Sequence, residues 1–189
     1  MLIEYDARAV RTSVALVDRA GVADLDRPTP CAGWTLRDLL AHMTAQHHGF
    51  AAAARGEEGL DAWRPRDLGE DPAAAYRAAA EHVLAAFSGA VAAEFPLPEL
   101  GVVVPAARAI GFHFIDYVVH SWDVARTLGL TVDFEPELLE AALPVAEAVP
   151  GGRARTVPGA SFAPAIAWTD GARLDRIVAM LGRSPVWPD

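Results

Sequence analysis

Apolar residues recur along most of this chain at the spacing of amphipathic helices. In the first segment they are separated by steps of four and three, and they are Ile3, Ala7, Val10, Val14 and Val17. This period predicts a helix that runs to about Ala20. Similar apolar stripes predict helices over residues 35–55, 72–91 and 105–129, the last of them apolar nearly all round. A helix of that kind is typical of the centre of a helical protein.

Local signals mark where these helices begin and end. Thr35 stands three residues before Asp38, which predicts a capping box at the start of the second helix. Asp71 followed by Pro72 predicts an N-cap with proline in the first helical position. Gly129 is placed to end the fourth helix in a left-handed conformation.

The last third of the chain is less regular. A fifth helix after residue 135 contains Pro144, which we expect to kink or shorten it. Residues 150–168 show several Gly and Pro turns and no period, so we expect an extended strap lying over the helices. Asp170 is placed to cap a short final helix that stops at Gly182. Strand signals are weak, since Val102–Val104 is the only β-branched run.

These elements predict an all-α fold in one domain covering residues 1–189. We expect a four-helix bundle over residues 1–148, with the irregular strap and the short final helix over residues 149–189. The long helices are joined by short connections, and no repeat or linker divides the chain.

Composition excludes several classes of function. The 189 residues include 25 acidic and 16 basic ones, a net charge of −9 that argues against a nucleic-acid partner. All the basic residues are Arg, which excludes chemistry that depends on a lysine, such as a P-loop or a Schiff base. A single cysteine, an acidic N-terminus and the absence of a long apolar run predict a cytoplasmic protein without a membrane span.

Polar residues interrupt the apolar segment 105–129 at regular steps. Four of them, spaced by three, four and three positions, are of the types that bind metals: His113, Asp116, His120 and Asp123. This spacing puts all four on one helix face, where two carboxylates and two imidazoles would be buried together. Such burial is unfavourable without a partner, and a divalent metal ion would supply one.

Spacing alone leaves more than one metal-binding pair open. His113 and His120 lie about 10.5 Å apart along a helix axis, so they do not readily share an ion. The pair is either Asp116 with His120 or His113 with Asp116. A third ligand then comes from a neighbouring helix, where His42 follows the apolar Leu39 by three positions. The alternative is that each residue is a hydrogen-bonded core group with no ion.

Three longer motifs resemble a known family. Residues 29–42 read Thr-Pro-Cys-Ala-Gly-Trp-Thr-Leu-Arg-Asp-Leu-Leu-Ala-His, residues 119–125 read Val-His-Ser-Trp-Asp-Val-Ala, and residues 181–187 read Leu-Gly-Arg-Ser-Pro-Val-Trp. They resemble the DinB-like, mycothiol-dependent maleylpyruvate isomerase N-terminal domain family, and the last resembles the ending of its short single-domain members. The resemblance spans nearly the whole chain.

The resemblance implies a four-helix bundle that holds one divalent metal, usually zinc and sometimes nickel. Carried over position by position, its ligands are His42, Asp116 and His120. The isomerase is expected to have Glu in place of Asp116, which is one methylene shorter. Asp116 therefore either ligates with the metal closer to the helix or acts through a water molecule.

Residues beside this ligand set have open roles. Asp123 either orients a ligand imidazole from outside the ligand set or pairs with the charge of Arg126 or Arg37. His113 is the other residue that could support the ligands in this way, although a satisfied core histidine is the simpler interpretation.

Three more residues have plain structural interpretations. We expect Cys31 to pack beside Trp34 rather than to act as a nucleophile. His47 and His48 lie off the face of His42 and are expected at the surface or at a helix contact.

The chemistry implied is that of a metal-activated thiol. Three protein ligands leave a position open, and a mycothiol-type thiol bound there would attack a small electrophile in a transfer or isomerisation reaction. The partners are then a small thiol and an electrophile, and a homodimer is compatible because related bundles often pair. The alternative is a metal-binding bundle without turnover, in which the ion is structural or acts as a sensor.

Overall fold

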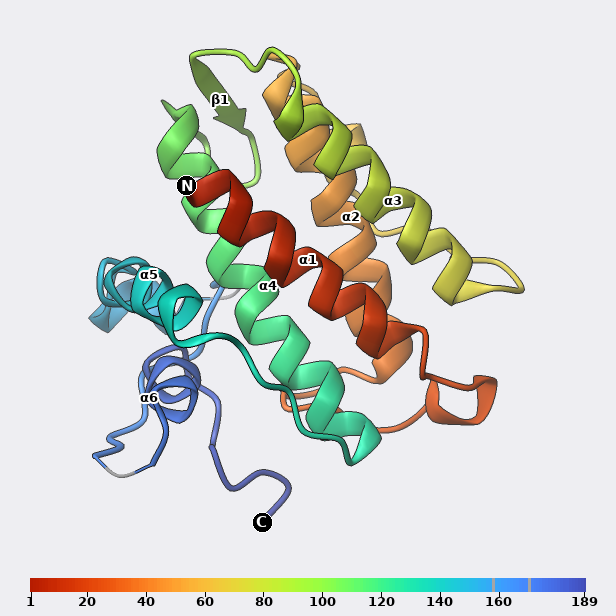
Figure 1. Ribbon diagram of the computed structural model, residues 1–189, viewed down its shortest axis with the longest axis vertical. Helices are drawn as coiled ribbons and strands as arrows, with labels where there is room; N and C mark the ends of the chain where they lie inside the picture. The colour runs from red at the N-terminus through yellow and green to blue at the C-terminus, as the bar shows by residue number, and fades with distance from the viewer. Residues whose placement is uncertain (158, 170) are drawn as a thin grey trace.

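The computed structural model describes residues 1–157, 159–169 and 171–189, and most of them are helical. Four long helices are labelled α1 to α4 in Figure 1 and are Leu2–Val17, Leu36–Ala54, Pro72–Ser88 and Ala106–Leu128. Two shorter ones are α5, Pro136–Glu147, and α6, Arg173–Met180. Single 3₁₀ turns are formed by Val22–Asp24, Leu60–Trp63 and Gly152–Arg155. No helix in these ranges is long and apolar enough to cross a membrane.

The predicted helix boundaries at three positions are confirmed. Thr35 accepts a hydrogen bond from the Asp38 backbone N–H, and the Asp38 carboxylate accepts one from the Thr35 N–H, which completes the capping box of α2. Asp71 caps α3 by accepting from the Ala74 N–H, with Pro72 in the first turn. Gly129 ends α4 with φ at +70°, a conformation that favours glycine.

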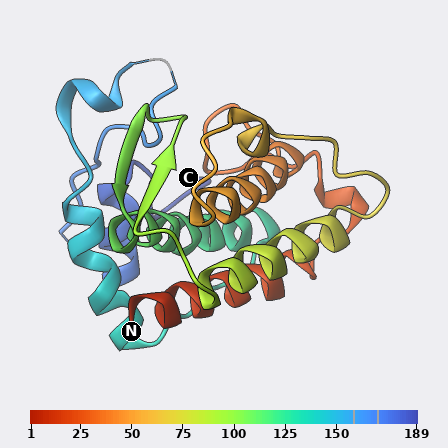
Figure 2. The same cartoon turned by 90° about the horizontal axis from the view of Figure 1, so that it is seen from above.

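Helix α4 is the central element of the molecule. It packs against α1, α2, α5 and α6, while α3 packs against α1 and α2 (Figures 1 and 2). Most of its side chains are buried, as the nearly uniform apolar pattern predicts. Because α4 contacts helices from both ends of the chain, side chains on its different faces can contact residues of the N-terminal and of the C-terminal helices.

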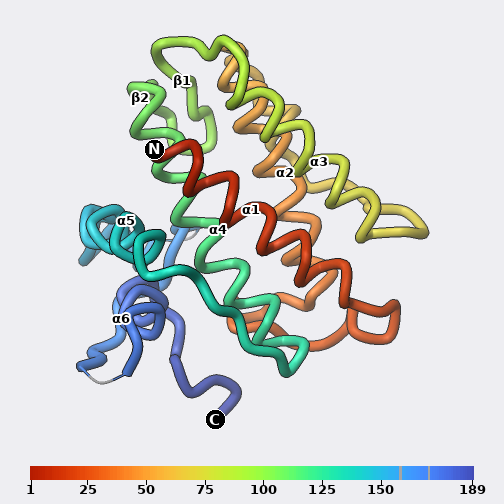
Figure 3. Tube along the Cα trace, viewed as in Figure 1, coloured from red at the N-terminus to blue at the C-terminus, as the bar shows by residue number. Residues whose placement is uncertain are grey.

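A small hairpin corrects the all-α expectation. Strands β1, Glu94–Leu97, and β2, Val102–Pro105, pair antiparallel with Phe95 opposite Val104, and they lie at one end of the helices (Figure 3). The predicted β-branched run is the second of these strands, and its partner was missed because Pro96 interrupts it. Phe95 is buried against α2 and α4, so the hairpin closes the core at this end.

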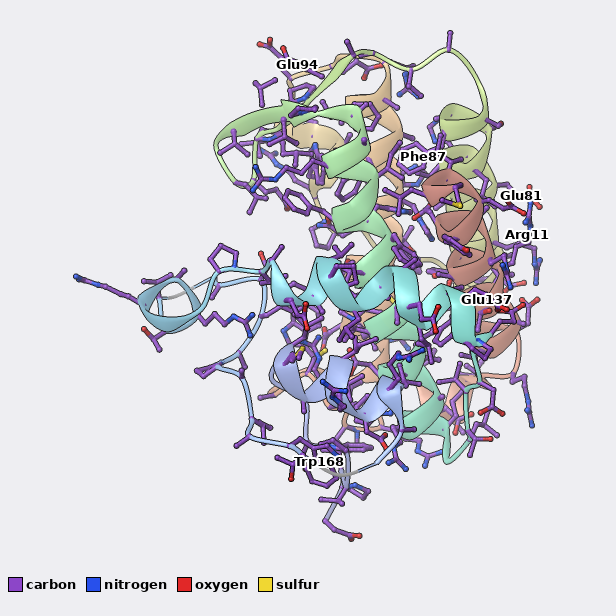
Figure 4. The ribbon with its side chains drawn as sticks, turned by 60° about the vertical axis from the view of Figure 1, so that its left-hand side comes forward. Arg11, Glu81, Phe87, Glu94, Glu137 and Trp168 are labelled. Carbon is purple, nitrogen blue, oxygen red and sulfur yellow. The ribbon has the colours of Figure 1, made fainter. Side chains whose placement is uncertain are left out.

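The C-terminal part is folded more tightly than an extended strap. A 3₁₀ turn contains Arg155, which is buried and donates to the carbonyl oxygens of Val149 and Pro150 at 3.1 and 2.7 Å. Helix α5 continues through Pro144 rather than stopping there. The expected cap Asp170 lies outside the described residues, and Asp175 caps α6 by accepting from the Ala172 N–H. Figure 4 shows Trp168 and Glu94 at opposite ends of the molecule.

Candidate metal centre

Helices α2 and α4 bring three predicted ligand residues together. One ligand atom from each of His42, Asp116 and His120 lies within 4.8 Å of the other two. His120 Nε2 is 3.3 Å from Asp116 Oδ1, and the His42 ring meets the His120 ring edge-on with centroids 5.4 Å apart. Donors around a tetrahedral zinc ion are roughly 3.4 Å apart. The distance from His120 to Asp116 already matches that spacing, and the ligand atom of His42 lies no more than 4.8 Å from either.

The site is buried but retains an opening to solvent. The His120 side chain is 4% exposed, whereas the Asp116 side chain is 19% exposed. His42 is half-buried, with the Trp34 ring packed 5.0 Å from its own. An ion could therefore reach the group from the Asp116 side, while Trp34 covers part of His42.

Electrostatics in this group suit a cation. Burial lowers the pKa of His42 to about 4, with a further contribution from the charge of His120, so the ring is neutral at pH 7 and offers a lone pair. Burial alone would raise the pKa of Asp116, but the charge and hydrogen bond of His120 hold it below its ordinary value. Burial would lower the pKa of His120, yet the charge of Asp116 and its hydrogen bond raise it well above the ordinary range. Without an ion, a proton on His120 compensates the carboxylate.

A second group shares His120 on the opposite side of its ring. Cys31, His120 and Asp123 also offer ligand atoms within 4.8 Å of one another. Asp123 Oδ2 lies 2.9 Å from His120 Nδ1, and it accepts a hydrogen bond from the Cys31 thiol at 3.3 Å. Cys31 is therefore more than a packing partner of Trp34, since its sulfur is part of a polar cluster.

The charge partner of Asp123 is neither Arg126 nor Arg37 but Arg183. Arg183 Nη2 donates to Asp123 Oδ2 at 3.1 Å, while Arg126 donates to the Pro185 carbonyl oxygen. Burial would raise the pKa of Asp123, but the charge of Arg183 lowers it, so Asp123 is an anion. Arg183 was not predicted as a partner of Asp123, because the two residues are 60 positions apart in the chain. The sequence feature that could have pointed to Arg183 is its position within the third motif, residues 181–187.

His113 belongs to a different cluster. Its Nδ1 lies 2.6 Å from Asp6 Oδ1, and its Nε2 lies 3.2 Å from His47 Nδ1. All three side chains are completely buried. The structure thus places His113 among core partners from α1 and α2, away from His42 and Asp123. Asp6 could have been found from sequence, because it occupies a helical step of four before the buried Val10.

The two histidines next in sequence have separate environments. His47 is fully buried and stacks on Tyr117 of α4 with ring centroids 4.1 Å apart, so of the two expected places it occupies a helix contact and not the surface. His48 lies at the contact of α2 with α3, where its Nδ1 is 3.4 Å from His82 Nδ1.

Comparison with known proteins identifies the family. The chain belongs to the mycothiol maleylpyruvate isomerase N-terminal domain family, whose model matches residues 7–125. The resemblance stated from the motifs is therefore confirmed. Two uncharacterized proteins of Mycobacterium tuberculosis, from strains CDC 1551 / Oshkosh and ATCC 25618 / H37Rv, are each 33% identical over 186 residues. The alignment covers 94% of this chain and 94% of each relative. No solved structure matches the chain.

Proposed function

We propose that this protein is a DinB-like four-helix bundle that binds a divalent metal and uses it to activate a mycothiol-type thiol. The thiol attacks a small electrophile, and it either stays bonded to the product in a transfer reaction or is released again in an isomerisation. The observation that carries the proposal is the convergence of His42, Asp116 and His120, with ligand atoms within 4.8 Å. Membership of a mycothiol-related family supports a thiol as the co-substrate.

The donor set fits zinc, with nickel as the alternative. Two imidazoles and one carboxylate are ligands that zinc accepts, and three protein ligands leave a position for a substrate. A bound ion of this kind supplies Lewis acidity, which lowers the pKa of a thiol that reaches the open position. Direct ligation by Asp116 is the simpler form of the proposal, because its Oδ1 already lies 3.3 Å from His120 Nε2.

The protein's own residues prepare this chemistry. His42 is neutral because it is buried, so it can bind a metal without first losing a proton. Asp123 accepts from His120 Nδ1, which directs the lone pair of Nε2 toward Asp116 and His42. Trp34 packs on His42 and limits its movement and its access to water. Asp116 is more exposed than His120, at 19% against 4%, and His42 is also only half-buried, so both offer access for a substrate.

Metal content tests the ligand set. We expect purified wild-type protein, loaded with zinc and desalted, to retain about one equivalent by elemental analysis. His42→Ala and a His42→Ala, His120→Ala double variant should lose it. His48→Ala is the matched control, since it truncates a histidine on the same helix outside the group. Equal metal in the wild type and the double variant would show that the ligands are elsewhere.

A metal-binding protein without turnover is the second candidate. The observation that favours it is the small exposure of the group, 4% for His120 and 19% for Asp116, which leaves little room for a substrate. A conjugation assay with zinc-loaded protein, mycothiol and a panel of model electrophiles separates the two functions. Thiol-dependent product supports the transferase or isomerase, and no product across the panel supports a structural or sensor ion.

A further inference from the structure

The chain returns to α4 after α6 and places a buried arginine beside the candidate metal centre. Arg183 is 6% exposed, and only Arg155 is comparably buried among the arginines of the described residues. Gly182 allows this approach, because its φ is +81° and an added Cβ would lie 2.7 Å from the Ala163 carbonyl oxygen. The turn at Gly182 directs the next side chain inward.

All three nitrogen atoms of the Arg183 guanidinium have partners. Its Nε and Nη2 donate to Asp123 Oδ1 and Oδ2 at 3.4 and 3.1 Å, and Nη1 donates to the Leu181 carbonyl oxygen at 2.9 Å. Nη2 also donates to Cys31 Sγ at 3.3 Å, and the guanidinium lies 5.4 Å from the centroid of the Phe162 ring. A buried bidentate contact of this kind fixes the position of the Asp123 carboxylate.

The orientation of Asp123 determines what His120 can bind. An ionised carboxylate can only accept a hydrogen bond, so His120 carries a proton on Nδ1 toward Asp123 Oδ2. The other nitrogen, Nε2, then faces Asp116 and His42. Arg183 therefore acts on the candidate ligands through Asp123 without touching them.

Arg183 also bears on the second donor group. Cys31, His120 and Asp123 could hold a cation by the distances between their ligand atoms. The guanidinium already donates to both Cys31 Sγ and Asp123 Oδ2, so a positive charge occupies the region that a second ion would need. Two cations in contact there would repel each other.

We propose that Arg183 is a positioning residue that selects between the two overlapping donor groups. It directs the metal to His42, Asp116 and His120 Nε2, and it excludes the metal from Cys31, Asp123 and His120 Nδ1. This inference rests on the proposed metal site. It assigns a role to a residue outside the family model, which matches positions 7–125 only.

Cobalt(II) titration of the full chain provides the test, because a cobalt–thiolate bond gives a charge-transfer band in the near ultraviolet. The wild type should bind cobalt without this band. Arg183→Met should bind cobalt about 10-fold more weakly, as expected when a supporting partner of a ligand is lost, and should show the band. Adding Cys31→Ala to Arg183→Met should remove the band again.

Two further variants separate this role from a structural one. Arg155→Met removes the other buried arginine, which binds backbone carbonyl oxygens of the same C-terminal part, so it should lower stability but leave the cobalt spectrum and affinity unchanged. Arg183→Gln removes the positive charge but keeps a hydrogen-bond donor for Asp123, so the thiolate band is expected even if Arg183→Met fails to fold.

The outcomes distinguish the two proposals. A wild type that binds no cobalt overturns the proposed function. A wild type that binds cobalt with a thiolate band overturns the inference, because the metal then already uses Cys31. A folded Arg183 variant that binds cobalt without the band also overturns the inference, because Cys31 then does not bind the metal even when the arginine is absent.

Discussion

Three ionisable side chains, Asp6, His113 and His47, form a hydrogen-bonded row through the core from α1 across α4 to α2. Each is completely buried, and Asp6 Oδ2 and His47 Nε2 at its two ends lack a hydrogen-bond partner among the described residues. Such a row stabilises the fold only while its charges are balanced, because an unpaired buried charge is strongly unfavourable. Acid should therefore destabilise the molecule through this row.

The pKa of His47 gives the sign of that effect. Burial lowers it well below the ordinary value, while in the unfolded chain it is about 6.5. Below about pH 6.5 the unfolded state binds a proton that the folded state does not, so the free energy of unfolding falls as the pH falls. The slope contributed by one such group is at most about 1.4 kcal/mol per pH unit. His42, with a pKa of about 4, adds a loss of the same sign.

Urea unfolding at a series of pH values between 7 and 5 measures this slope. His47→Gln should show a shallower loss of stability on acidification than the wild type, whatever its stability at pH 7. Thr44→Ala, which changes a buried side chain of α2 that does not ionise, serves as the control and should keep the wild-type slope. Equal slopes for His47→Gln and the wild type would mean that His47 is not the group that titrates.

Two glycines lie in helices at contacts with other segments, and only one of these contacts requires a glycine. A Cβ on Gly49 of α2 would lie 2.5 Å from Trp63 Cε3, so α2 and the 3₁₀ turn Leu60–Trp63 pack too closely for any side chain there. A Cβ on Gly111 of α4 would meet only Leu2 and Val145, at 3.8 and 3.9 Å, which is ordinary contact.

The two alanine substitutions should therefore have opposite effects. Gly49→Ala is expected to lower the free energy of unfolding by about 1–3 kcal/mol through overpacking. Gly111→Ala is expected to raise it by about 0.5–1 kcal/mol, because alanine favours the helix more than glycine does. Chemical denaturation of both variants beside the wild type measures the difference. A stabilised Gly49→Ala variant would contradict the close approach of Trp63.

Elements with local signals were predictable from sequence, and elements without them were not. The capping residues Thr35 and Asp71 and the terminator Gly129 act within a few residues of their own helices, so their patterns can be read directly. The first strand of the hairpin has no such signal, because Pro96 breaks its pattern and its stability comes from pairing with Val102–Pro105.

In the candidate site too, residues with a local sequence signal were predictable, and residues that meet the site only in the folded molecule were not. Spacing on α4 left two ligand pairs open, and the family motifs favoured Asp116 and His120 together with His42. Ligand atoms of these three residues lie within 4.8 Å of one another. Arg183 was missed because it meets α4 only after the distant C-terminal part folds back on it. Periodicity within one helix contains no information about such partners.

The C-terminal part completes the molecule around α4. Helix α6 packs on α4 and α5, and Arg155 ties the preceding turn to carbonyl oxygens near the end of α5. Through Arg183 the same part reaches Asp123, so the residues near the candidate metal centre come from nearly the whole length of the chain. The site and the C-terminal fold should therefore be lost together on unfolding.

Anomalous diffraction from zinc-loaded crystals, recorded on both sides of the zinc absorption edge, would locate the ion. We expect one strong peak enclosed by His42, Asp116 and His120 Nε2, about 2.0–2.2 Å from each donor atom. A peak between Cys31 and Asp123, or no peak near His120 in crystals of protein that retains zinc, would contradict it.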